Sequence, residues 1–64
     1  MKIQEVEKAL ADVRPGGVFR QERAGTQYIK TTQELHHGNV VVVNVKTGEL
    51  SNMFTANTVI EIMN

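Results

Sequence analysis

Hydrophobic and polar positions follow two different periods along this 64-residue chain. Four apolar residues near the N-terminus are spaced by three or four positions: Ile3, Val6, Leu10 and Val13. This spacing is typical of one face of an α-helix. The pattern therefore predicts an amphipathic helix over residues 3–13, which ends before Pro15 because the residue preceding a proline favours extended backbone. So short a helix is not stable alone, so we expect it to lie on a sheet.

From Val18 onward the period changes to two, which is typical of β-strands. The alternation and the intervening turn residues predict strands at about 18–21, 26–32, 39–45, 49–54 and 59–63. Residues 40–43 are all valine, so the third strand presents apolar side chains on both faces and must be covered on both sides. We expect a single, mainly β domain of α+β class over residues 1–64: a helix followed by a five-stranded antiparallel, SH3-like barrel or strongly bent sheet.

The small size of the chain points to association with a second copy. A domain of this length is marginally stable, and the sequence contains no cysteine that could form a disulfide. We therefore expect a homo-oligomer. The residues expected at its interface lie on the helix stripe and the valine strand: Ile3, Val6, Leu10, Val40 and Val42. The alternative is a monomer in which the helix covers the outer face of the valine strand.

Composition argues against a membrane partner and does not favour nucleic acid. Seven Lys and Arg residues balance seven Asp and Glu residues, so no net charge draws the chain to nucleic acid or to an anionic membrane. No apolar run reaches the roughly 18 residues of a membrane span, and the N-terminus lacks a signal-peptide pattern. We expect a cytoplasmic protein with no membrane partner.

Candidate catalytic and metal-binding motifs are sparse. His36 and His37 form the one histidine cluster, with Glu34 as the nearby carboxylate, and we interpret this segment as a solvated loop tip rather than a metal site. The glycines after Pro15 precede a strand, which is the reverse of the order in a phosphate-binding loop. Ser51 is the one serine, and no base or orienting group is placed beside it by the pattern. We expect no enzyme activity, no metal and no cofactor.

A basic and aromatic grouping in the first hairpin offers an alternative. Arg20 and Lys30 would stand side by side across this hairpin with Tyr28 between them, and such a patch can stack and neutralise single-stranded nucleic acid. Glu22 in the same hairpin and the zero net charge favour the other interpretation, in which the aromatic rings are core and the charges are solvated.

Three segments resemble a recurrent kind of small phage-encoded protein with an SH3-like β-barrel. They are Pro15-Gly-Gly-Val-Phe19, Val43-Asn-Val-Lys-Thr-Gly-Glu-Leu50 and Thr58-Val-Ile-Glu61. The resemblance covers residues 15–62 and leaves out the N-terminal helix. It implies an SH3-like barrel and an accessory role in a phage, and it carries over no catalytic residue.

These observations lead to one favoured function and two alternatives. We expect a non-enzymatic binding module, encoded by a phage or mobile element, that docks to a host or phage protein or sequesters a small signalling nucleotide. The resemblance implies a counter-defence or host-takeover role. The residues expected to bind the ligand or partner are Arg20, Arg23, Tyr28, Lys30, Asn52 and Asn57. The alternatives are a nucleic-acid-binding module that uses the first hairpin and a structural virion or assembly protein.

Overall fold

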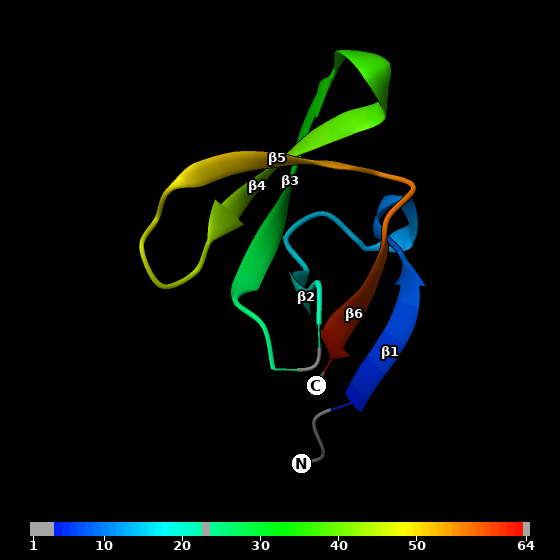
Figure 1. Ribbon diagram of the computed structural model, residues 1–64, viewed down its shortest axis with the longest axis vertical. Helices are drawn as coiled ribbons and strands as arrows, with labels where there is room; N and C mark the ends of the chain where they lie inside the picture. Colours follow the sequence, from blue (N-terminus) through cyan, green and yellow to red (C-terminus); the bar gives the residue numbers. More distant parts are fainter. Residues whose placement is uncertain (1–3, 23, 64) are drawn as a thin grey trace.

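The computed structural model describes residues 4–22 and 24–63, and these form one antiparallel sheet. Its six strands are β1 (Gln4–Ala9), β2 (Val18–Arg20), β3 (Gln27–Leu35), β4 (Asn39–Asn44), β5 (Leu50–Phe54) and β6 (Thr58–Met63). Their order across the sheet is β1-β6-β2-β3-β4-β5 (Figure 1). Two short 3-10 turns, η1 (Leu10–Asp12) and η2 (His36–Gly38), complete the secondary structure of the described residues. The fold is therefore all-β.

The predicted N-terminal helix over residues 3–13 is wrong. Residues 4–9 form β1, which pairs with β6 along its whole length, from Gln4 opposite Met63 to Ala9 opposite Thr58. An isolated helix of this length is marginal in water, whereas the strand gains ladder hydrogen bonds with β6. The helical spacing survives only in η1 and the residue after it, where Leu10 and Val13 both enter the core. Ile3 lies outside the described residues.

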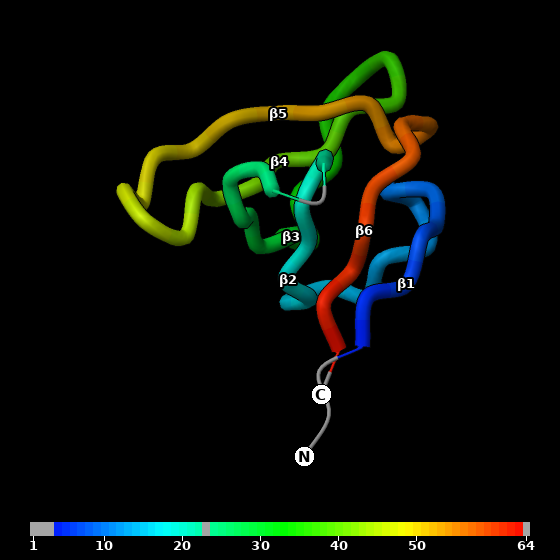
Figure 2. Tube along the Cα trace, turned by 60° about the horizontal axis from the view of Figure 1, so that its bottom comes forward, coloured from blue at the N-terminus to red at the C-terminus, as the bar shows by residue number. Residues whose placement is uncertain are grey.

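The expected five-stranded SH3-like barrel is also wrong, because the sheet has six strands and is open. Strands β1 and β5 stand at opposite ends of the strand order and do not pair with each other. The sheet bends strongly, so that β5 passes over the β6 side of the molecule (Figure 2). Two backbone hydrogen bonds link η1 to the turn after β5: Leu10 N–H to the Asn57 carbonyl and Ala11 N–H to the Thr55 carbonyl, both at 2.8 Å.

The hydrophobic core lies on the concave face of the bent sheet. Its buried residues are Leu10, Val13, Phe19, Val40, Val42, Met53 and Val59. Tyr28 packs against this cluster, and its ring stacks on Phe19 with the ring centroids 5.8 Å apart. Because successive side chains of a strand point to opposite faces, Val40 and Val42 fill the core while Val41 and Val43 face outward.

Strands β2 to β6 overlap the five strand ranges expected from the sequence. The largest difference is in β3, which continues to Leu35 and contains a register shift between Lys30 and Glu34. The polar segment after Thr32, which the sequence suggested was a loop, therefore belongs partly to a long β3–β4 hairpin. The tip of that hairpin is η2, which projects from the body of the molecule (Figure 1).

Candidate binding surface

The face of the sheet opposite the core carries a row of apolar side chains across five strands. The register places Ile62 of β6 beside Val18 of β2 and Val18 beside Ile29 of β3. It continues with Ile29 beside Val43 of β4 and Val43 beside Leu50 of β5. We call these five residues the outer row. Each alternates with a residue that points inward, as Val18 does with Phe19, so the outer row and the core lie on opposite faces.

The outer row is partly exposed to solvent. Leu50 is 71% exposed, whereas Val18, Ile29, Val43 and Ile62 are half-buried. An antiparallel sheet with one face toward water usually carries polar side chains on that face. The apolar outer row departs from this rule, and such departures mark interaction surfaces.

Charged groups border one end of the outer row. Glu5 of β1 pairs in register with Ile62, and its carboxylate lies 3.2 Å from the Arg20 guanidinium. Glu7 and Arg20 both flank Ile60, also on the outer face. An apolar centre with a charged border is the usual composition of a protein–protein interface.

Most of the residues predicted to form an oligomer interface lie in the core. Leu10, Val40 and Val42 have no exposed surface, so they cannot contact a second copy while the chain keeps this fold. Val6 is 36% exposed on β1, and Ile3 lies outside the described residues. A run of four valines gives no sign of which parity faces inward, which is why the sequence selected the buried pair rather than Val41 and Val43.

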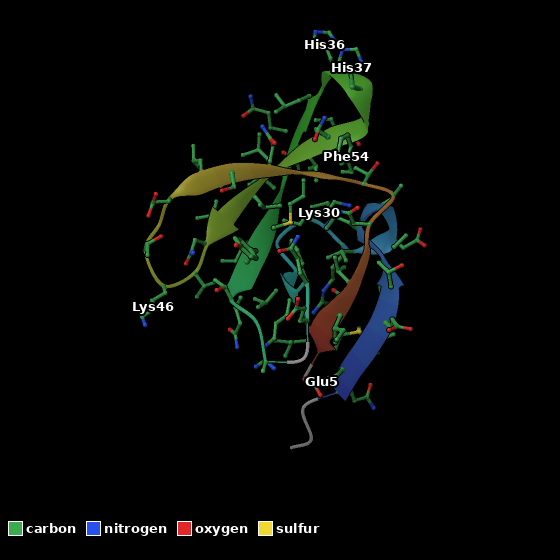
Figure 3. The ribbon with its side chains drawn as sticks, viewed as in Figure 1. Glu5, Lys30, His36, His37, Lys46 and Phe54 are labelled. Carbon is green, nitrogen blue, oxygen red and sulfur yellow. The ribbon has the colours of Figure 1, made fainter. Side chains whose placement is uncertain are left out.

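Lys30, predicted to bind a ligand, is buried and bound to the chain itself. Its ammonium donates hydrogen bonds to the carbonyls of Leu10 at 3.0 Å, Ala11 at 3.1 Å and Val13 at 2.7 Å. Figure 3 shows Lys30 within the body of the molecule. A lysine whose three donors all meet backbone carbonyls is not available to an external ligand.

The structure does not bring Arg20 and Lys30 together. Arg20 lies on the outer face beside Gln27, whereas Lys30 shares the inner face with Tyr28. The expected nucleic-acid patch across the first hairpin is therefore divided between two faces, and that alternative loses its support. Arg23 lies outside the described residues.

The two predicted asparagines occupy separate positions. Asn52 is exposed in the middle of β5. Asn57 lies in the turn between β5 and β6, where its backbone N–H donates to the Phe54 carbonyl at 3.1 Å. A shallow pocket of about 350 Å³ between the β2–β3 turn and the β4–β5 loop is lined by other residues: Ala24, Gly25, Thr26, Gln27, Val45 and Lys46. None of the predicted ligand residues that the structure describes lines this pocket.

His36 and His37 sit at the tip of the β3–β4 hairpin, away from the rest of the chain (Figure 3). His37 has a φ of 65°, in the left-handed region that non-glycine residues rarely adopt. Within residues 4–22 and 24–63, no group of three or more His, Cys, Asp or Glu side chains is placed to hold a metal ion.

A buried carboxylate that sequence reasoning missed lies under the Pro15-Gly16-Gly17 segment. Glu61 is 1% exposed; its Oε1 lies 2.6 Å from the Lys8 ammonium and its Oε2 lies 3.4 Å from Arg14 Nε. The parity of β6 could have found it, because Glu61 is two residues from the buried Val59 and alternates with Ile60 and Ile62. This ion-paired group ties β1 to the sheet rather than facing solvent.

Comparisons with protein-family models, with curated proteins and with solved structures found no match. Within the described part of the chain, no helix is long and apolar enough to cross a membrane. The functional argument therefore depends on the surface itself.

Proposed function

We propose that this chain is a small non-enzymatic module that docks onto another protein through the outer row. The observation that supports it is the unbroken cross-strand series from Ile62 to Leu50 on the face opposite the core. In the setting that the phage resemblance implies, the partner is a host protein and the encounter takes place in the host cytoplasm.

The physical advantage of docking comes from removing the outer row from water. Fully burying a leucine side chain is favourable by roughly 1.5–3 kcal/mol, and Leu50 is mostly exposed in the single chain. The four half-buried residues add smaller amounts. Glu7, exposed at the border of the row, favours a partner that places a basic side chain beside an apolar patch.

The interior of the molecule supports a binding role rather than a catalytic one. Within residues 4–22 and 24–63, the two buried charged side chains are Lys30 and Glu61, and both are engaged by groups of the chain itself. A general acid or base must reach a substrate proton, and neither group is directed into the pocket beside Lys46.

The experiment is a quantitative affinity purification of a tagged chain from host cells, followed by mass spectrometry. The test variant is Ile62→Lys, which places a charge in the outer row. The matched control is Gln33→Lys, which adds the same charge at an exposed position of β3 outside the row. We expect one protein to be enriched by the wild type and by Gln33→Lys and to be lost with Ile62→Lys.

The recovered partner is then purified and titrated into each variant by calorimetry, with far-UV circular dichroism to show that each variant is folded. Equal affinity of Ile62→Lys and Gln33→Lys for that partner would refute docking through the outer row. Recovery of virion components alone would support the structural alternative instead.

A further inference from the structure

The two edges of the sheet are protected to very different degrees. Natural edge strands avoid pairing with other chains by carrying charges, prolines or bulges. Strand β1 follows this rule, because it carries Glu5, Glu7 and Lys8. Strand β5 has the sequence LSNMF, with no charged residue or proline, and its pairing with β4 shows no register shift. The β5 edge is therefore open to another strand.

The backbone groups on that edge can be assigned from the hydrogen bonds that flank it. Asn44 N–H donates to the Glu49 carbonyl and Thr55 N–H donates to the Gly38 carbonyl, both at 2.8 Å. Antiparallel ladders alternate between hydrogen-bonded and non-hydrogen-bonded pairs. With the register of β4 and β5, odd-numbered residues of β5 therefore bond to β4, and Leu50, Asn52 and Phe54 direct their N–H and C=O groups away from it.

This outward set has two-fold symmetry about Asn52. We propose that β5 pairs antiparallel with β5 of a second copy around a two-fold axis at Asn52. Leu50 then lies opposite Phe54 of the partner subunit, and Asn52 lies opposite Asn52 of the partner subunit. The Phe54 carbonyl already accepts the Asn57 N–H at 3.1 Å, and the other outward N–H and C=O groups of the strand meet complementary groups, which gives about four main-chain hydrogen bonds. Figure 2 shows β5 at the outside of the sheet, with β4 on one side.

Side chains and charges agree with this pairing. Leu50 and Phe54 are 71% and 56% exposed in the single chain, and opposite one another they form an aromatic–aliphatic cross-strand pair. Glu49 would lie opposite Thr55, so no like charges meet along the edge. The pairing joins the two sheets into one, and the outer rows of both copies continue on the same face. It uses the backbone edge of β5 and shares only the Leu50 side chain with the outer row of the proposed function, so either could hold without the other.

The first test is a cross-link across the two-fold axis. A hydrogen-bonded antiparallel pair has a Cα separation of about 5.5 Å, which is within the range of about 4.4–6.8 Å that disulfides span. The chain has no cysteine, so Asn52→Cys provides a single thiol. We expect oxidation to convert it to a covalent dimer. Gln33→Cys, exposed on β3, is the control, and equal cross-linking of the two variants would overturn the proposal.

The second test measures the dimer directly by sedimentation equilibrium. Asn52→Pro removes an outward N–H and leaves the β4 ladder intact, and proline is accepted where an edge N–H faces solvent. Each dimer loses two hydrogen bonds, so the dissociation constant should rise roughly thirtyfold. If this variant does not fold, Asn52→Lys, which places like charges opposite each other, should also weaken the dimer. A wild type that is monomeric at all concentrations would overturn the proposal.

Ile62→Lys separates the two proposals. Dimerisation that survives this substitution supports pairing through the edge. Dimerisation that is lost with Ile62→Lys and unaffected by Asn52→Pro would overturn it, because the copies would then meet through the outer row. If Ile62→Lys abolishes binding of the protein partner and leaves the dimer intact, each proposal is supported by its own measurement.

Discussion

Replacement of Lys30 by methionine should destabilise the chain although it removes a polar group from the interior. Methionine has a similar length and keeps the apolar part of the lysine side chain. It cannot donate the hydrogen bonds that the ammonium makes to Leu10, Ala11 and Val13. These carbonyls belong to η1 and the residue after it, so the substitution loosens the connection between β1 and β2.

The size of the effect follows from the state of each carbonyl. The Leu10 carbonyl also accepts the Val13 N–H at 3.1 Å, so it keeps a partner. The cost falls mainly on the buried Val13 carbonyl, because Ala11 is exposed and water can reach its carbonyl. A buried acceptor left unsatisfied costs about 1–3 kcal/mol. The substitution also removes the desolvation penalty of the buried ammonium, and this offsets part of the cost. The net loss should be about 2 kcal/mol, against a total stability of roughly 3–10 kcal/mol for a chain of this length.

Urea unfolding followed by far-UV circular dichroism and Tyr28 fluorescence measures this loss. With a slope of about 1 kcal/mol per M, the midpoint should fall by roughly 2 M. The control is Lys46→Met, an exposed lysine of the β4–β5 loop, which should change stability by less than about 0.5 kcal/mol. If Lys30→Met is as stable as Lys46→Met, the ammonium does not hold η1 in place and the reasoning is refuted.

Three further substitutions test other features by the same unfolding assay. Glu61→Gln weakens the 2.6 Å contact with Lys8 and should cost about 2 kcal/mol; an unchanged midpoint would contradict a structural role for the charge. Gly17→Ala places a Cβ 2.7 Å from Glu61 Oε2 and 2.9 Å from the Arg14 carbonyl, so we expect a loss of about 2 kcal/mol, and a neutral result would mean that the segment yields. His37→Gly relieves the positive φ of 65° and should raise stability by up to about 1 kcal/mol, visible as a higher midpoint of thermal unfolding, whereas a lower midpoint would argue against strain there.

Strands could be located from the sequence because their signals are local. The alternation after Val18 and the turn glycine Gly48, with a φ of 77°, identify β4 and β5 without knowledge of their partners. The prediction for the N-terminal segment was wrong because the signal that determines its structure is not local. This segment pairs with β6, and the contact of Lys8 with Glu61 joins residues 53 positions apart. No local sequence pattern predicts a pairing over that distance.

The sequence also could not predict which face of each strand points into the core. In β4 the sequence shows that both faces are apolar, but choosing between Val40 and Val41 requires the register with β3 and β5. The same choice decides whether Lys30 is a surface charge or a buried donor, because its parity is that of Tyr28. Sequence reasoning identified the apolar excess of this strand, and the expectation of a partner drawn from it stays a prediction, but Val40 and Val42, which it selected for the interface, are buried in the core.

The pairing of β1 with β6 has a consequence for the order in which the molecule assembles. Among the described residues, β1 pairs only with β6, and the other four strands lie between the two in the sequence, so we expect β1 to pair after the hairpins between them have formed. Until β1 pairs with β6, the ion pair between Lys8 and Glu61 cannot form, because it joins the same two strands. Closure of so long a loop is entropically costly, and we expect the docking of β1 to be the late step that converts a partly formed sheet into the native protein.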